Sequence, residues 1–204
     1  GVFKMADGSV ITIPNLLGGL NMTDVYQPIL GEVGSLLNNV FAGNNGPGAL
    51  IQRCLGAKIN GGYFGTDPTG TVGIGNTGPG IEVTDSKLTE VHQATISGNE
   101  EEGLYGHELP DDESGEPTLT VSESNIGVVK TENGAVTAVK NNSDGMKLVD
   151  VGKFLIGVQG VLNNRKKNVI SANQGNGVTV RSSGLFGGAL QSLINHTILG
   201  TDES

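Results

Sequence analysis

The residues with the chemistry to act as nucleophiles, bases or metal ligands are few and spread along the chain. The sequence has one cysteine, Cys54, and three histidines, His92, His107 and His196. The histidines show neither H-x-x-x-H nor H-E-x-x-H, the spacings that place two zinc ligands on one helix face. Cys54 cannot form an intrachain disulfide, and its position in an apolar stripe predicts a small buried core residue. The sequence contains no catalytic set, so we expect a protein that is not an enzyme.

The candidate cation site lies in an acidic stretch, residues 99–117, which holds eight acids and no Lys or Arg. Four of these acids, Glu108, Asp111, Asp112 and Glu113, lie within a few positions of one another. Carboxylates at such short spacing are the ligands that Ca²⁺ prefers, although the EF-hand pattern is absent. The stretch predicts an exposed acidic loop, with calcium as the one candidate cofactor.

A glycine motif and a basic run could in principle bind phosphates. Residues 73–78 match G-x-G-x-x-G, but Pro79-Gly80 follows them, so no helix can begin there to hold a pyrophosphate. The basic run is Arg165-Lys166-Lys167, in a chain with 12 Lys and Arg against 21 Asp and Glu and a net charge of −9. Duplex binding needs clustered cations, so we expect no sequence-specific nucleic-acid contact. The run is either a solvated turn or a contact for an acidic partner, such as the 99–117 loop of another copy.

The elements that must position these residues divide into helical and extended segments. Apolar residues recur at spacings of three and four over 22–41, which predicts an amphipathic helix, and a second short helix over 49–57 would complete a helical hairpin, residues 22–57. The same periodicity predicts a C-terminal helix over 184–199, whose polar face is uncharged, as expected if another subunit covers it. Residues 153–162 fit either a strand or a buried helix.

The middle of the chain has the short alternating runs and turn residues of strands. The extended N-terminal segment 1–14 fits a strand or a hairpin around Asp7-Gly8, and we expect another hairpin around Asn133-Gly134. No internal repeat is evident. Further short strands are expected at 71–75, 81–84, 118–123, 146–151, 169–172 and 177–181. The sequence therefore predicts a single α+β domain over 1–204, with a Gly-rich β middle of hairpins, a small sheet or a sandwich, and amphipathic helices near both ends.

The composition favours a structural role. Gly supplies 34 of 204 residues, aromatic residues make 4%, and Trp is absent. We expect a self-assembling protein, most simply a virion component of tailed-phage type (tail, neck, decoration or fibre), whose partners are other copies and neighbouring structural proteins. The alternatives are an extracellular calcium-stabilised adhesin or carbohydrate-binding module, and an enzyme of unknown class.

The location follows from what the sequence lacks. No apolar run is long enough for a transmembrane segment. No secretory signal is visible at the start, which predicts production in the cytoplasm and residence in a virion or an extracellular assembly.

Overall fold

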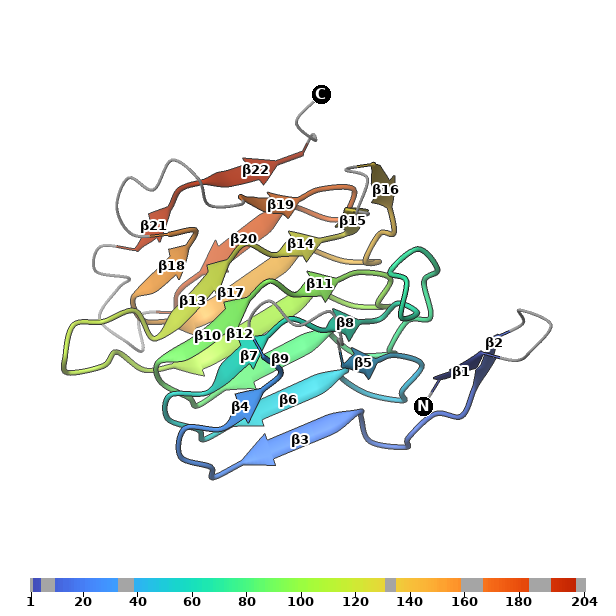
Figure 1. The fold of residues 1–204 in the computed structure, drawn as a ribbon. Helices are drawn as coiled ribbons and strands as arrows, with labels where there is room; N and C mark the ends of the chain where they lie inside the picture. The colour runs from blue at the N-terminus through green and yellow to red at the C-terminus, as the bar shows by residue number, and fades with distance from the viewer. Residues whose placement is uncertain are drawn as a thin grey trace.

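A computed structural model describes residues 2–4, 10–32, 39–130, 135–158, 167–183 and 192–200. In these ranges every regular element is a β-strand, and no helix occurs. Three parallel six-stranded sheets form the body, and two short antiparallel hairpins are added to it. Each turn of the chain gives one strand to each sheet in the same order, so the chain is a parallel β-helix of six coils (Figure 1).

The three sheets are named here in the order in which the chain meets them. Sheet 1 contains β3 (Leu20–Thr23), β6 (Ala49–Gln52), β9 (Ile81–Thr84), β12 (Leu104–Leu109), β17 (Met146–Val151) and β20 (Val178–Arg181). Sheet 2 contains β4 (Ile29–Leu30), β7 (Lys58–Asn60), β10 (Thr89–His92), β13 (Leu119–Ser122), β18 (Phe154–Ile156) and β21 (Leu193–Ile194). Sheet 3 contains β5 (Val40–Phe41), β8 (Tyr63–Phe64), β11 (Thr95–Ile96), β14 (Asn125–Ile126), β19 (Asn168–Ile170) and β22 (Thr197–Leu199). The hairpins are β1 (Val2–Lys4) with β2 (Val10–Thr12), and β15 (Val128–Lys130) with β16 (Val136–Ala138).

The core is built from columns of aliphatic side chains, because equivalent residues of successive coils lie in register. In sheet 2, for example, Ile59, Val91 and Val121 are in-register partners, and none of them is exposed. Alternate residues of each strand point inward, as the two-residue period of a strand requires. Burial of these columns against one another supplies the stability that a single coil lacks.

A ladder of asparagines runs along the corner between sheets 3 and 1. Its members are Asn15, Asn44, Asn76, Asn99, Asn141 and Asn173. Nδ2 of each of the first five donates to Oδ1 of the asparagine in the next coil, at 2.8–2.9 Å, and Asn173 Nδ2 donates to the Ile126 and Ser171 carbonyls. Stacked amides of this kind satisfy buried polar groups by repetition, since every interior member is at once donor and acceptor.

A glycine follows each ladder asparagine by four residues. These glycines are Gly19, Gly48, Gly80, Gly103, Gly145 and Gly177, and an apolar residue comes directly after each. A Cβ at Gly103 would lie 2.6 Å from the Gly145 carbonyl oxygen and 2.8 Å from Nδ2 of Asn141. The pattern Asn-x-x-x-Gly-apolar is therefore the signature of one coil, and the expectation that the sequence has no internal repeat is wrong. Its spacing varies from 23 to 42 residues between asparagines, which hides the repeat from a search for a fixed period.

Corners between sheets 1 and 2 are turned by residues in the left-handed backbone region. Asp24, Arg53 and Asp85 follow β3, β6 and β9 with φ of 59, 49 and 47°. Arg53 donates from Nε and Nη2 to the two carboxylate oxygens of Asp24, at 2.7 and 2.8 Å. Such corners end each strand after a few residues, and the chain then enters the next sheet.

The predicted α+β class is wrong, and the helical hairpin over 22–57 is replaced by β3 to β7. A spacing of three and four arises here because short strands with a two-residue period are separated by short corners. Tyr26 and Ile29, which a helix stripe would bury, are exposed. Residues 33–38 of the predicted helix lie outside the described residues.

Two further expectations near the C-terminus and the acidic stretch are also corrected. The C-terminal part of the predicted helix over 184–199 consists of the strands β21 and β22, and residues 184–191 lie outside the described ranges. The acidic stretch 99–117 is not one loop, because the strand β12 runs through it. The ambiguous residues 153–162 contain the strand β18, and residues 159–162 are not described.

Several strands were predicted correctly, but with the wrong partners. β9 and β17 have the predicted bounds, and the two hairpins pair antiparallel as expected, their turns (residues 5–9 and 131–134) lying outside the described residues. The strand predicted at 71–75 is absent. In the body, a strand pairs with strands of the adjacent coils and not with its neighbour in sequence. The β-rich character is thus confirmed, and the small sheet or sandwich is replaced by a solenoid.

Candidate functional site

The four acids proposed for calcium do not converge. Glu108 is exposed within β12, Asp111 Oδ1 accepts from the Lys153 backbone N–H at 2.8 Å, and Asp112 accepts from the backbone N–H and the hydroxyl of Ser114. Glu113 is also exposed. Within the described residues, no three His, Cys, Asp or Glu side chains form a group that could hold a metal ion. The calcium site stays a prediction to which the geometry adds no support.

The histidines and the cysteine lie at separate places. His92 is on sheet 2, with Nδ1 2.9 Å from the Ser122 hydroxyl, His107 is on sheet 1, and His196 lies between β21 and β22. Cys54 is buried, as predicted, and its thiol donates to the Gln52 carbonyl at 3.4 Å. Residues 165 and 166 of the basic run are not described, and Lys167 is exposed.

A group of four contacting polar and aromatic side chains lies on the outer face of sheet 1. Glu82, Tyr105 and Lys147 are in-register partners on β9, β12 and β17, and they point outward because their neighbours in each strand point into the core. His107 stacks on Tyr105 with ring centroids 4.6 Å apart, and its Nε2 lies 3.0 Å from Oε1 of Glu82. The Lys147 ammonium lies 5.2 Å from the Tyr105 ring centroid, in cation–π geometry. We call these four residues the sheet 1 patch.

Two glutamates beside the sheet 1 patch, Glu101 and Glu102, interact with its charged side chains. Lys147 Nζ lies 3.0 Å from Oε1 of Glu102, whose side chain is 8% exposed, and this hydrogen bond raises the pKa of Lys147. Partial burial, followed by the charges of Glu102 and Glu82, raises the pKa of Glu101. The patch thus presents an aromatic ring, a cation and carboxylates on one face, and most of its polar groups are already paired with one another.

The C-terminal coil, here coil 6 (residues 173–200), leaves the core columns open. Each column ends in an apolar side chain, Val180 in sheet 1, Ile194 in sheet 2 and Leu199 in sheet 3. These three are 47, 43 and 50% exposed, whereas their partners Leu148, Ile156 and Ile170 in the preceding coil are at most 1% exposed. At this end the core is therefore bounded by three half-exposed aliphatic side chains.

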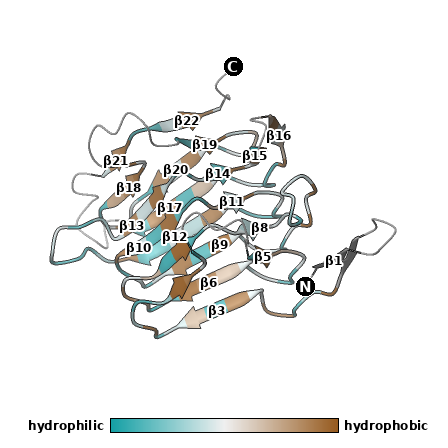
Figure 2. Cartoon of the chain, viewed as in Figure 1, coloured by the Kyte–Doolittle hydropathy of each residue, from teal (hydrophilic) through white to brown (hydrophobic). Residues whose placement is uncertain are grey.

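The N-terminal coil, here coil 1 (residues 15–43), begins the same columns. Met22, Leu30 and Phe41 pack on the core from one side and are only partly buried. Leu16 and Leu17 are exposed beside them. In Figure 2 the strand β21 is brown, the colour of hydrophobic residues, and β3 at the other end of the stack is tan to pale. Both ends of the solenoid thus present apolar side chains and a strand edge.

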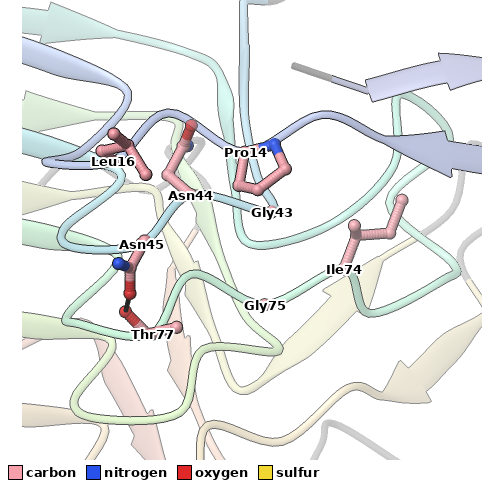
Figure 3. Close-up of a pocket in the computed structure, with 8 residues that line it drawn as sticks. All are labelled: Pro14, Leu16, Gly43, Asn44, Asn45, Ile74, Gly75 and Thr77. Carbon is pink, nitrogen blue, oxygen red and sulfur yellow. Dashed lines mark hydrogen bonds between the residues drawn. The ribbon is translucent and has the colours of Figure 1, made fainter.

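A groove lies where the N-terminal segment crosses the corner turns of the first two coils (Figure 3). Pro14, Leu16 and Ile74 supply its apolar lining. Asn45 accepts from the Thr77 hydroxyl at 3.2 Å, and Asn44 belongs to the asparagine ladder. Because these polar side chains are already hydrogen-bonded, the groove has the character of a packing seam.

The glycine motif at residues 73–78 has a structural explanation. Asn76 is a ladder member, and a Cβ at Gly75 would lie 2.3 Å from the Gly98 carbonyl oxygen. Close packing between coils therefore demands this glycine, and no helix follows the motif.

The comparisons with known proteins give no relative. No family model matches the chain, and neither a curated protein nor a solved structure matches it. No helix able to cross a membrane occurs among the residues that the structure describes. Function must therefore be argued from the open ends and the sheet 1 patch.

Proposed function

We propose that this protein is a structural, self-assembling β-helix that works through contacts at its end coils. The observation that carries the proposal is the half-exposure of Val180, Ile194 and Leu199, which end the three core columns at 43–50% exposure. The preceding coil buries the equivalent positions, since Leu148, Ile156 and Ile170 are at most 1% exposed. An apolar end with unpaired strand edges is a surface that another β-edge can cover.

A virion component (tail, neck, decoration or fibre) is the setting that we propose for this assembly. The composition supports it, because the chain is rich in Gly and poor in aromatic residues, and the described body is one uninterrupted β-stack. The partners would be other copies and neighbouring structural proteins. Location in a virion or an extracellular assembly follows from this proposal.

Two adjacent residues of β21 provide a matched test. Leu193 and Ile194 are 44 and 43% exposed, but Ile194 continues the inward column whereas Leu193 lies on the outer face of sheet 2. Ile194→Glu places a charge where a covering coil would bury it, and Leu193→Glu does not. We expect light scattering after size exclusion to show oligomers for the parent chain and for Leu193→Glu, and a monomer for Ile194→Glu.

The result that contradicts the proposal is a parent chain that stays monomeric at all concentrations tested. Equal oligomerisation of both variants would also contradict it, because the end coil would then not be the contact. Far-UV circular dichroism of both variants checks that neither substitution has unfolded the β-helix.

Binding of a carbohydrate is a second candidate function, and the sheet 1 patch is the observation that favours it. Tyr105 offers an aromatic ring among carboxylates and an ammonium, a combination suited to hydrogen bonding and stacking of a sugar ring. The test is binding of a panel of neutral and acidic oligosaccharides by calorimetry, with Tyr105→Ala compared with Tyr26→Ala, an exposed tyrosine at a corner of coil 1. Binding lost only with Tyr105→Ala supports this function, and no binding to any panel member contradicts it.

A further inference from the structure

We infer that the outer edge of β16 (Val136–Ala138) is a docking site for an extended strand of another protein, with apolar residues at the centre of that strand and acidic residues at its ends. The site lies in the middle of the chain, so the inference goes beyond the proposed contact at the end coils. All three residues of β16 are exposed, Val136 at 36%. In Figure 1 β16 lies at the margin of the fold, outside β15.

The hairpin of β15 and β16 is anchored on the body by β15 and by one of its faces. The Val128 carbonyl of β15 accepts from the buried Ser97 hydroxyl at 3.1 Å. A Cβ at Gly70 would lie 2.8 Å from Cγ1 of Val129, so one face of the hairpin packs on the loop that contains this glycine. Among the described strands, β16 pairs with β15 alone. Its opposite edge is therefore open to a further strand.

The phase of the hydrogen bonds in the hairpin shows which backbone groups face this open edge. In an antiparallel pair, residues that bond to the partner strand alternate with residues whose N–H and C=O point away from it. The Val139 N–H donates to the Gly127 carbonyl at 3.0 Å, so the next residue that bonds to β15 is Thr137. By the same alternation, the N–H and C=O groups of Val136 and Ala138 point away from β15. These alternating donors and acceptors are the groups with which an added strand pairs.

The edge of β16 lacks the features by which natural proteins protect a free strand. Those features include charged side chains, proline and β-bulges. Val136, Thr137 and Ala138 are uncharged, and each pairs with one residue of β15, so the hairpin has no bulge here. An anchored, exposed and unprotected edge favours pairing with another chain.

The charges beside the edge indicate an acidic partner. From β14 to the ladder residue Asn141, the charged side chains among the described residues are Lys130 and Lys140, and neither forms an ion pair with a described acid. Lys130 is the register partner of Val136, and Lys140 lies two residues beyond Ala138, so both lysines share one face with these apolar residues. An added strand would place apolar residues beside β16 and an acid beside Lys140, which complementary charge favours.

Peptide binding tests the inference, with a probe that reads the same in both chain directions. The probe is the dye-labelled peptide Glu-Thr-Val-Thr-Val-Thr-Glu with blocked ends, and its control has Lys in place of both Glu residues. Fluorescence anisotropy with the full chain should show saturable binding of the acidic peptide, with a Kd below about 1 mM. Binding of the basic peptide should be weaker by about tenfold or more.

Substitutions at the edge locate the binding. Ala138→Pro removes an outward N–H but none of the hydrogen bonds between β15 and β16, and proline is tolerated at such edge positions. Ala138→Ser keeps the N–H and is the matched control. We expect Ala138→Pro to weaken binding of the acidic peptide by about tenfold or more, and Ala138→Ser to leave it unchanged. Lys140→Glu tests the site without proline, because it should weaken the acidic peptide and strengthen the basic one.

The outcomes separate this inference from the proposed self-assembly. The inference is overturned if the acidic peptide does not bind, if both peptides bind equally, or if Ala138→Pro binds as Ala138→Ser does while circular dichroism shows both folded. Oligomers that Ala138→Pro disperses and Ile194→Glu does not would also overturn it, because the occupant would then be a second copy. Equal peptide binding by the parent chain and by Ile194→Glu supports a site separate from the end coils. A parent chain that binds the peptide and stays monomeric contradicts the proposed self-assembly alone.

Discussion

Asn99 lies at the middle of the asparagine ladder, and its removal isolates what the ladder contributes. The side chain is fully buried and makes three short hydrogen bonds. Nδ2 donates to the Phe64 carbonyl at 3.0 Å and to Asn141 Oδ1 at 2.9 Å, and Oδ1 accepts from Asn76 Nδ2 at 2.9 Å. Asn99→Ala removes all three and adds no polar atom in their place.

The cost follows from the number of bonds and from burial. A net intramolecular hydrogen bond contributes about 1 kcal/mol, so three of them give a loss of about 3 kcal/mol in the free energy of unfolding. The remaining partners limit the penalty, because the Phe64 carbonyl still accepts from the Ser97 N–H and Asn141 Oδ1 still accepts from the backbone N–H of residue 99. The matched control is Asn15→Ala, since Asn15 is exposed and makes one ladder bond, so its loss should stay below about 1 kcal/mol.

Urea denaturation followed by circular dichroism and by tyrosine fluorescence measures both variants. Coincidence of the two probes establishes that unfolding is two-state and that the free energies can be compared. The reasoning is refuted if Asn99→Ala and Asn15→Ala lose the same free energy, because the interior of the ladder would then contribute no more than its exposed end.

Three further substitutions test the packing and the charges. Gly103→Ala should cost about 1–3 kcal/mol because its Cβ meets three atoms at 2.6–2.8 Å, whereas Gly177→Ala, with nothing nearer than 3.5 Å, should be nearly neutral in the same urea titration. Lys147→Ala should cost about 2 kcal/mol in the free energy of unfolding, since its partner Glu102 is buried. Lys58→Ala should cost less than about 0.5 kcal/mol, since its ion pair with Glu90 has the same length but is exposed. Equal losses would contradict the role of burial. The raised pKa of Glu101 means that its ionisation disfavours the folded state, so Glu101→Gln should raise stability slightly at pH 7. This gain should disappear in acid, where the glutamate is neutral in both states, and a gain that persists at pH 3 would contradict this reasoning.

Some strands and turns could be predicted from the sequence, because they depend on residues that are close together in the chain. Alternating runs predicted β9 and β17, and glycine-containing turns predicted both hairpins. The burial of Cys54 was also expected. Residues of the sheet 1 patch were not predicted as a group, because Glu82, Tyr105 and Lys147 belong to three coils and only register brings them together.

The helices were predicted wrongly for a reason specific to solenoids. A strand of two to four residues is too short to show its own period, and corners of a few residues impose an irregular spacing that resembles a helix stripe. One signal could have corrected this, namely the six occurrences of Asn, three residues, Gly and an apolar residue. At five of the six positions glycine is required by the closeness of the next coil, which is a consequence of stacking, and Gly177 in the last coil is the exception.

The sequence by itself determined that the chain is β-rich, acidic and built from short segments with frequent turns, because these properties depend on composition and on neighbouring residues. Only the tertiary structure decided which strands pair, because each hydrogen-bonded partner is a whole coil away. It also decided that Val180, Ile194 and Leu199 end the core columns, half-exposed at one face. Pairing between coils is a long-range choice, made by the simultaneous fit of three aliphatic columns and one asparagine ladder.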